Sequence, residues 1–417
     1  MIRFFLFLLP WLIASAATAQ PATLPFRDFT VAADGSGDFR TISEAIHALP
    51  MYTYERVVIF IKKGIYHEKI RLEQDHITLL GEDRDSTVIA YSQLREDWEA
   101  NKDAIGPAVI NIAGDDIILD NLTVWNTQPK EGPHAFTLYG TGTRTILQRC
   151  RLLSKGADTV SLWNYKQGMY YHSDCEFEGG VDFVCPRGWC YITNSRFFET
   201  QTTAAIWHAG GFEQGQKMVI RSSYFNGVPG FHLGRHHYEA QFFLLDCRFS
   251  ENMADKPIYR VSYPDQPARN RPYFWGDRRY FYNAHKEGTP FSWLENNLDT
   301  SGLSPETITA AWTFDGQWDP ESRTPPQLLS WQLHEQDIIL HFSEPLSIRG
   351  IPVLTTPDGL ALRFAEGNGR DTLRFHSSQP LHRTHFTAKQ LTLTEGQIIA
   401  SKASVQEKPL PSHLKLN

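Results

Sequence analysis

Cysteine is scarce in this chain, with five residues in 417. Because the number is odd, at least one thiol stays free unless a bond forms between chains. Cys150, Cys175 and Cys247 recur at one position of a repeat and are interpreted as small buried residues. Cys185 and Cys190 flank Pro-Arg-Gly-Trp and could close a small loop, so a disulfide between them stays open at this point.

The chain also lacks any run of lysine or arginine, and its net charge is −7. This charge argues against non-specific binding of nucleic acid. A hydrophobic content of 41% with 21% charged residues is that of an ordinary globular protein with a buried core.

The one extended apolar stretch stands at the amino terminus. It runs from Phe4 to Ile13, follows Arg3 and contains Pro10, which makes it too short and too interrupted for a comfortable membrane span. Ala17-Thr18-Ala19 has the pattern of a signal-peptide cleavage site. We therefore expect residues 1–19 to be a signal peptide, the protein to be exported to a periplasm or secreted, and no membrane span in the mature chain.

Two aspartates occupy matching places in successive segments of similar sequence. Asp158 lies in Gly-Ala-Asp-Thr-Val and Asp182, 24 residues later, in Gly-Val-Asp-Phe-Val. On adjacent coils of a parallel β-helix they would stack at the spacing of neighbouring strands, about 4.8 Å. Because two carboxyls so close cannot both ionise cheaply, one pKa should rise while the other group stays an anion. The pair is therefore a candidate acid and nucleophile for hydrolysis.

A repeat of strand-forming residues governs the middle of the chain. Its members share a polar pair, a small or apolar central residue and an apolar end, and the central residues are Leu122, Cys150, Cys175, Ser195, Ser223 and Cys247. The steps between them are 28, 25, 20, 28 and 24 residues. Periods of this length favour a right-handed parallel β-helix over a propeller, whose blades need about 40–45 residues. Residues 88–124 have the character of its first coils.

The two ends of the chain differ from this repeat. The segment 41–49 has a helix start signal, with Thr41 as N-cap and Glu44 three residues later, and is expected to cover the amino-terminal end of the solenoid. A proline-rich linker begins at Trp318. Alternating segments beyond it predict a small immunoglobulin-like β-sandwich over residues 327–412, behind a β-helix over residues 28–318. The predicted fold class is therefore all-β.

Several ordered motifs between about Val31 and Trp318 resemble the pectin methylesterase (pectinesterase) family, and the chain looks like a divergent bacterial member. They are Val31-Ala-Ala-Asp-Gly-Ser-Gly-Asp-Phe-Arg-Thr-Ile42, Gly64-Ile-Tyr-His-Glu68, Ala157-Asp-Thr159, Val181-Asp-Phe-Val184 and Leu233-Gly-Arg235. The resemblance implies a right-handed parallel β-helix that hydrolyses the methyl esters of galacturonate in pectin and releases methanol. It also implies a pectic polysaccharide partner and neither cofactor nor metal.

The resemblance further implies a role for three residues. Asp182 would be the nucleophile that forms an acyl-enzyme. Asp158 would be the acid that protonates methanol and then the base that activates water. Arg235 would orient the nucleophile and the substrate, and its charge would keep Asp182 ionised.

The chain departs from the family's pattern around these residues. Two glutamines that the family uses to stabilise the oxyanion are replaced by Ala157 and, on the preceding coil, His134. Because a ring N–H can donate, His134 is a candidate oxyanion donor. The usual Phe-Gly after the nucleophile motif reads Cys185-Pro186, and the usual Pro-Trp after the arginine reads His236-His237. Sugar-binding platforms are then expected from other side chains, with the candidates Trp163, Trp207, His237 and Trp189. Such a rebuilt pocket would suit a branched pectin.

Three alternatives stay open. The first is a metal site at His232 and His236, which would share one face of a strand while His237 points away. The second is a calcium-dependent enzyme similar to pectate lyases, which would need a cluster of carboxylates where the chain offers a pair. The third is a carbohydrate-binding relative that has lost catalysis with its oxyanion donors.

Overall fold

The computed structural model describes residues 28–53, 56–210, 213–270, 272–322, 326–343, 346–368, 370–400 and 410–416. The expected signal peptide, residues 1–19, lies outside this part of the chain. Within it, none of the helices combines the length and the apolar character that crossing a membrane requires.

Three long parallel sheets build the larger part of the structure, and in each of them every strand is hydrogen-bonded to the next. Sheet 1 consists of β1 (Phe29–Val31), β2 (Val57–Ile61), β5 (Ile77–Gly81), β8 (Ile118–Asp120), β11 (Thr145–Gln148), β14 (Met169–Ser173), β17 (Trp189–Thr193), β20 (Met218–Arg221), β23 (Gln241–Leu245) and β26 (Arg278–Tyr282). From its far edge back, sheet 2 consists of β27 (His285–Lys286), β24 (Arg248–Phe249), β21 (Tyr224–Gly227), β18 (Arg196–Glu199), β15 (Glu176–Gly179), β12 (Arg151–Leu153), β9 (Thr123–Asn126), β6 (Thr87–Tyr91) and β3 (Gly64–Tyr66). Sheet 3 consists of β25 (Tyr259–Arg260), β22 (His232–His236), β19 (Ala204–His208), β16 (Val184–Pro186), β13 (Val160–Leu162), β10 (Leu138–Gly140), β7 (Ile110–Ile112) and β4 (Ile70–Leu72).

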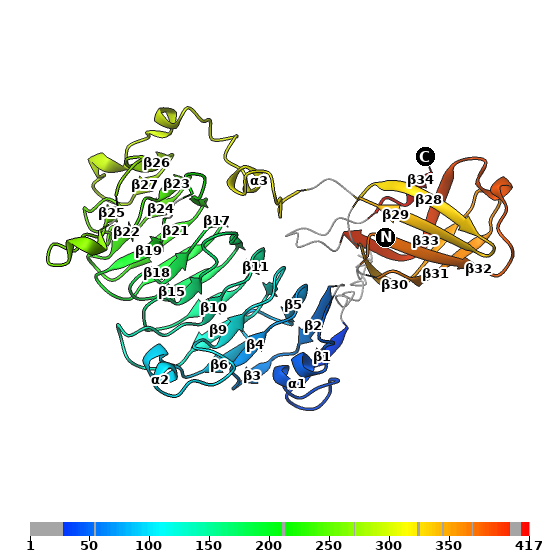
Figure 1. Cartoon of the computed structure of the whole chain (residues 1–417), viewed down its shortest axis with the longest axis horizontal. Coiled ribbons are helices and arrows are strands. Elements are labelled where there is room, and N and C mark those ends of the chain that lie inside the picture. The colour runs from blue at the N-terminus through cyan, green and yellow to red at the C-terminus, as the bar shows by residue number, and fades with distance from the viewer. Residues whose placement is uncertain are drawn as a thin grey trace, which may run out of the picture.

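Successive coils each give one strand to every sheet, in the order sheet 1, sheet 2, sheet 3, and stack along one axis (Figure 1). This is the predicted right-handed parallel β-helix. Its interior is one continuous cluster of buried apolar side chains, with a ladder of phenylalanines from Phe177 through Phe197 and Phe225 to Phe249. Burial of such rings is the main stabilising contribution to a solenoid, whose coils contact only their neighbours.

The predicted repeat is the corner between sheets 1 and 2. The residue before each central position has a positive φ, between 49° and 57°, and the residues are Asn121, Arg149, Asp174, Asn194, Ser222 and Asp246. One residue in the left-handed region turns the chain sharply, and the next side chain then points into the coil. The central residues are buried there, and the thiols of Cys150, Cys175 and Cys247 donate to backbone carbonyls of the preceding coil. The limited space inside the corner explains why the central residues after Leu122 are all cysteine or serine.

The β-helix begins earlier than the sequence suggested. Strands β2 to β5 belong to coils that precede residue 88, so the expectation that the first coils lie in residues 88–124 is wrong. The corner after β2 is made by Lys62, Lys63 and Gly64 rather than by a single left-handed residue, so the repeat signature is missing there.

The expected amino-terminal cap is present as helix α1 (Ile42–His47). The Thr41 side chain accepts from the Glu44 N–H, and the Glu44 carboxylate accepts from the Thr41 N–H, so the predicted capping box is confirmed. Ile42, Ala45 and Ile46 pack on the end of the core. The remaining helices are α2 (Arg95–Ala100), α3 (Ala310–Thr313) and the 3₁₀ turns η1 (Pro267–Arg269), η2 (Ser292–Leu294), η3 (Leu298–Ser301) and η4 (Arg383–Phe386).

The predicted small β domain is also present. Its strands run in the order β28 (Leu328–His334), β29 (Asp337–Phe342), β32 (Thr372–Ser377), β31 (Ala361–Glu366), β30 (Leu346–Thr355), β33 (Gln390–Ala400) and β34 (His413–Lys415), and each neighbouring pair is antiparallel. These strands surround a core of their own. They join in one continuous sheet, closer to a barrel than to the two facing sheets of an immunoglobulin-like sandwich. The long strands β30 and β33 pair within it across a bulged register.

Candidate active site

Asp158 and Asp182 stand at the same position of two successive coils, each two residues before a strand of sheet 3. Val160 of β13 pairs directly with Val184 of β16. The 24 residues between these partners equal the spacing of the two aspartates in the sequence. Both aspartates have left-handed backbone conformations, with φ of 59° and 58°. Aspartate tolerates this region better than most residues. The two turns therefore bring the carboxyl groups to one edge of sheet 3, as predicted.

The turn that carries Asp182 is strained, because Val181 before it also has a positive φ of 44°. This conformation is a genuine outlier for a β-branched residue and persists only where its surroundings hold it. The Val181 N–H donates to the Thr203 hydroxyl at 3.1 Å, and the buried Glu199 carboxyl accepts from the Gln201 N–H at 3.0 Å. The coil behind the turn thus supports it with fixed polar groups.

Arg235 on β22 contacts both oxygens of the Asp182 carboxylate. Its Nε lies 2.8 Å from Oδ1 and its Nη2 lies 2.7 Å from Oδ2, which is a bidentate ion pair. The Asp182 side chain is 9% exposed and that of Arg235 26%. Charge-assisted pairs of this geometry are among the stronger polar interactions and fix orientation as well as charge. The structure therefore joins two of the predicted residues directly.

The two carboxyl groups differ in their electrostatic surroundings. Burial and the nearby Asp182 charge raise the pKa of Asp158 to about 7, against the opposing positive charges of Arg187, Arg95 and Arg235. Burial also raises the pKa of Asp182, but the hydrogen bonds and charge of Arg235 oppose that rise. Asp158 therefore keeps its proton to a higher pH than usual, while Arg235 favours the ionised form of Asp182, and acid-assisted nucleophilic attack requires this division of roles.

His134 lies beside Asp158, as the sequence suggested. Its Nε2 is 3.8 Å from Asp158 Oδ2, and the backbone of His134 forms a parallel bridge with Ala157 on the next coil. Burial and the charge of Arg95 lower the pKa of His134, so the ring is neutral at pH 7 and has one N–H to donate. Ala157 is buried and has no polar side chain.

Trp163, Trp207 and His237 gather on the same outer face of sheet 3, but around a residue that was not predicted. The Arg187 guanidinium lies 3.8 Å from the Trp163 ring centre and 4.7 Å from that of Trp207. The Trp207 Nε1–H donates to His237 Nδ1 at 2.5 Å. Burial and the charge of Arg235 lower the pKa of His237 to about 4, which leaves a neutral ring. The register could have revealed Arg187, since it follows Pro186, the partner of Leu162, and so falls beside Trp163.

Other predicted groups lie elsewhere. Trp189 is on β17 of sheet 1 and donates to Asp315, away from the aspartates. His236 is buried and its Nδ1 lies 2.6 Å from the Tyr238 carbonyl oxygen, while His232 is partly exposed. No group of three or more His, Cys, Asp or Glu residues within the described part of the chain is placed to hold a metal ion.

The open question of the disulfide is answered in the structure, where all five cysteines are free and buried. Cys185 is on β16 of sheet 3, where its thiol donates to the Val160 carbonyl and contacts the Ser161 hydroxyl at 3.3 Å. Cys190 is on β17 of sheet 1, inside the core. The two residues therefore belong to different sheets.

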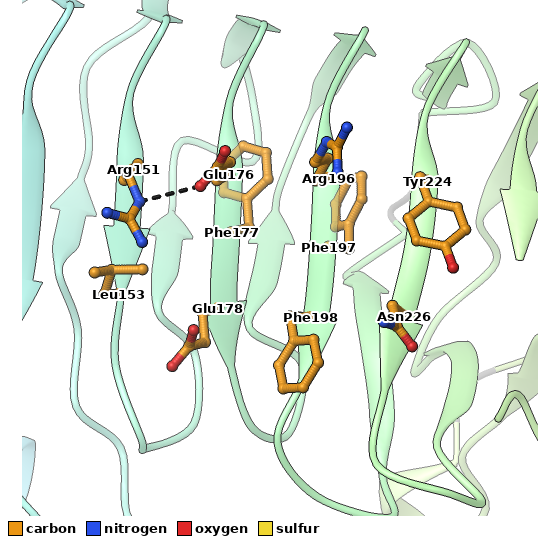
Figure 2. A pocket seen from close by; sticks show the side chains of 10 residues that line it. All are labelled: Arg151, Leu153, Glu176, Phe177, Glu178, Arg196, Phe197, Phe198, Tyr224 and Asn226. Atoms are coloured by element: carbon orange, nitrogen blue, oxygen red, sulfur yellow. Dashed lines mark ion pairs between the residues drawn. The ribbon is translucent and has the colours of Figure 1, made fainter. Parts of the chain in front are cut away.

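A separate hollow of about 260 Å³ lies on the outer face of sheet 2. Figure 2 shows its side chains, with Arg151 and Glu176 paired across neighbouring strands at 3.0 Å. Phe198 is 41% exposed there. None of the predicted site residues lines this hollow, so the candidate active site is the edge and outer face of sheet 3.

Comparison with known proteins is consistent with this geometry. A family model described as Pectinesterase matches residues 28–206, which include Asp158 and Asp182 but end before Arg235. A probable pectinesterase of Arabidopsis thaliana is 32% identical over 187 residues, 42% of this chain and 62% of that protein. In two pectinesterase/pectinesterase inhibitor proteins, from Ficus pumila var. awkeotsang and, as a putative member, from Arabidopsis thaliana, the chain covers 28% and 38% of the length. The chain thus spans less than two thirds of these relatives.

Solved structures share the fold. The pectin methylesterase PemA of Erwinia chrysanthemi superposes with a TM-score of 0.58 at 20% identity, over 71% of this chain and 99% of that one. A pectin methylesterase in complex with a hexasaccharide gives the same TM-score and identity over 72% of this chain and 100% of that one. Such identities show the fold alone. Together with the match of residues 28–206, they show that the parallel β-helix of this chain is similar to that of the pectinesterases.

Proposed function

We propose that this protein is a carboxylic ester hydrolase that removes methyl groups from the galacturonate residues of pectin and releases methanol. The observation that carries the proposal is the pair of stacked carboxyls, Asp158 and Asp182, of which only Asp182 is bonded to the guanidinium of Arg235. The family match and the solved relative bound to a hexasaccharide support a polysaccharide substrate. Export from the cell, as proposed from residues 1–19, would bring the enzyme to such a substrate.

The proposed reaction begins with attack of the Asp182 carboxylate on the ester carbonyl carbon. A new C–O bond forms, and the carbonyl π electrons move to its oxygen. When this oxyanion collapses, the bond to the methoxy oxygen breaks and Asp158 transfers its proton to that oxygen, so methanol leaves. An anhydride between Asp182 and the uronate remains. Covalent catalysis of this kind divides one difficult step into two.

In the second step Asp158, now ionised, acts as the base. It takes a proton from a water molecule, whose oxygen attacks the carbonyl carbon of the uronate in the anhydride. The bond between that carbon and the Asp182 oxygen breaks, which restores the Asp182 carboxylate and yields a free uronate. The raised pKa of Asp158 suits both steps, because a general acid and base works best when its pKa is near the working pH.

The oxyanion needs a hydrogen-bond donor, and losing one donor typically costs about 10²–10³ in kcat. We propose His134 for this role, because its neutral ring has one N–H and lies beside Asp158. Ala157 offers no second side-chain donor. This rebuilt site, with Arg187, Trp207 and His237 on its floor, supports action on a branched pectin rather than on plain homogalacturonan alone.

Methanol release from a panel of simple and branched methyl-esterified pectins tests the proposal. The wild-type protein should release methanol without shortening the polymer, and Asp182→Asn should not. A rise in ultraviolet absorbance from unsaturated ends, with no methanol, would instead identify a lyase. Retention of polysaccharide without any product would identify the carbohydrate-binding relative, the candidate that Ala157 favours.

A further inference from the structure

The hollow on the outer face of sheet 2 is built from two rows of side chains that stand in register (Figure 2). One row is Arg151, Glu176, Arg196 and Tyr224, and the other is Leu153, Glu178, Phe198 and Asn226. The residues between the two rows point into the core, as the buried Phe197 does. The outward side chains therefore form a surface whose spacing is fixed by the sheet.

Two aromatic rings of this face are open to solvent. Phe198 is 41% exposed and Trp125 is 46% exposed. Trp125 pairs in register with Leu153, so it belongs to the same row as Phe198, three strand steps away. At roughly 4.8 Å per step the two positions are about 14 Å apart. A single exposed ring needs no explanation, but two in one row give two contacts to a chain that runs across the strands.

The polar side chains beside Phe198 differ from those at the other end of the hollow. Arg151 and Glu176 pair at 3.0 Å, and Arg84 adds a contact to Glu176 at 3.5 Å. Among the side chains drawn in Figure 2, Arg196 and Glu178 form no ion pair. Asn226 Oδ1 accepts from the Gly227 N–H at 2.8 Å, and its Nδ2 is a further donor. A cationic donor, an anionic acceptor and an amide thus surround one exposed ring.

The charges of the hollow cancel, since two arginines and two glutamates line it. Such a surface attracts neither a long anion nor a long cation. It suits an uncharged ligand that has an apolar face for Phe198 and groups that both donate to Glu178 and accept from Arg196. A sugar ring has this combination. The volume of about 260 Å³ is slightly below the roughly 300 Å³ of the smallest ligand pockets, which fits one ring.

We propose that the outer face of sheet 2 binds an uncharged sugar of a pectic polysaccharide, with the ring on Phe198 and the hydroxyl groups at Arg196, Glu178 and Asn226. Trp125 contacts a further sugar of the same chain. The identity of the polysaccharide rests on the proposed function, to which this adds a second binding site on a different sheet from Asp182. Because a polymer held there stays close to the aspartates, the site raises its effective concentration at the active site.

Calorimetric titration of the full chain with neutral galactan and arabinan oligosaccharides measures this site without turnover. The wild type should bind at least one of them, and Phe198→Ala should bind it at least about tenfold more weakly. Phe198→Trp keeps an aromatic face and should retain binding. Ile65→Ala removes an exposed apolar side chain from the last strand of the same sheet and should bind as the wild type does. Thermal unfolding checks that each variant is folded.

Two results of the titration would overturn the proposal. One is that the wild type binds neither neutral oligosaccharide. The other is that Phe198→Ala binds as tightly as the wild type. Sedimentation of the same samples covers a different occupant, because a wild-type dimer that Phe198→Ala dissociates, with no sugar bound, would identify this face as a contact between two copies of the chain.

Kinetics distinguish the second site from the proposed function. On short methyl-esterified galacturonate oligomers Phe198→Ala should leave kcat and KM unchanged, whereas on a branched pectin with neutral side chains it should raise KM several-fold at unchanged kcat. A lower kcat on the short oligomers would show that Phe198 serves the active site and would overturn the proposal. Oligosaccharide binding that depends on Phe198, with no methanol from any pectin, would overturn the esterase alone.

Discussion

Asp158 and Asp182 occupy equivalent positions on adjacent coils, yet of the two only Asp182 forms a bidentate ion pair, with Arg235. Arg235 contacts both of its oxygens, while Asp158 has the neutral ring of His134 beside it, at 3.8 Å. Symmetry of the fold and asymmetry of the surroundings together produce two chemically different carboxyls. The distinct roles proposed for them follow from their partners, because their backbone positions are alike.

Replacing Asp182 with asparagine should abolish ester hydrolysis, with kcat lower by at least about 10³. The amide is isosteric but is not a nucleophile, so the fold should survive. Methanol release and a thermal unfolding curve measure both effects. Asp174→Asn is a matched control, because Asp174 also has a left-handed conformation but is exposed at a corner between sheets 1 and 2. Near wild-type turnover by Asp182→Asn would show that the nucleophile is another group.

The pH profile should be bell-shaped with its upper limb near pH 7. The pKa of Asp158 is raised to about 7, so its proton is present below that pH and is lost as pH rises through it. Asp182 must be ionised, so activity should also fall as pH drops through its pKa, which burial places above the ordinary value. Plots of kcat/KM against pH report such groups in the free enzyme. Activity that keeps increasing to pH 9 would contradict the acid role of Asp158.

The same raised pKa makes a prediction about stability. Because the folded state holds the Asp158 proton to a higher pH than the unfolded state, the free energy of unfolding should decrease as pH rises from about 4 to about 7. Asp158→Asn removes this decrease in the free energy of unfolding and should stabilise the protein at pH 8 by on the order of 2 kcal/mol. The same substitution should abolish turnover. Denaturant unfolding at pH 5 and pH 8 measures it. A variant no more stable than the wild type at pH 8 would show that Asp158 carries no such penalty.

His134→Ala should lower kcat about tenfold or more, because its ring N–H is the proposed donor to the oxyanion. His134→Gln places an amide donor at the same position and should retain much more activity than alanine. Single-turnover release of methanol separates this effect from product release. If alanine and glutamine lower kcat equally, or if neither does, His134 is not the donor.

The repeat could be predicted from the sequence because a physical constraint repeats with it. Every corner between sheets 1 and 2 from Asn121 onward has one left-handed residue followed by a buried one, which is small at every corner after Leu122, and this leaves a visible pattern. The earlier coils lack such corners. The strand Val57–Ile61 is uniformly apolar, and without such corners these coils carry no repeat signature in the sequence.

Site residues whose positions follow from the coil spacing could be predicted from the sequence. Residues whose role depends on how far a side chain reaches, or on burial by neighbouring coils, could not. Asp158 and Asp182 follow from the coil spacing, and Arg235 from the resemblance. Arg187 was missed because only the register of Pro186 with Leu162 shows that its guanidinium reaches two indoles. Glu199 was missed because its sequence context is that of an ordinary alternating strand, while its burial depends on neighbouring coils.

Glu199 is expected to position the nucleophile. Burial raises its pKa to about 9, the charge of Asp182 adding to the effect, so the carboxyl is neutral at pH 7. Glu199→Gln should therefore keep the hydrogen bond from the Gln201 N–H and much of the activity. Glu199→Ala would leave the Gln201 N–H without its acceptor and would create a cavity behind the Val181–Asp182 turn. The free energy of unfolding should therefore fall by about 1–3 kcal/mol.

The expected kinetic result follows from the strain of that turn, since Val181 and Asp182 both have positive φ and depend on support from behind. Glu199→Ala should lower kcat with little change in KM, whereas a merely structural loss would lower the fraction of folded enzyme and leave kcat per active site unchanged. Active-site titration with thermal unfolding distinguishes the two results. Thr200→Ala, a substitution next to Glu199 that removes a hydroxyl bonded to the Gly179 carbonyl, is the control and should leave kcat intact. If Glu199→Ala matches this control in kcat, Glu199 stabilises the coil without positioning Asp182.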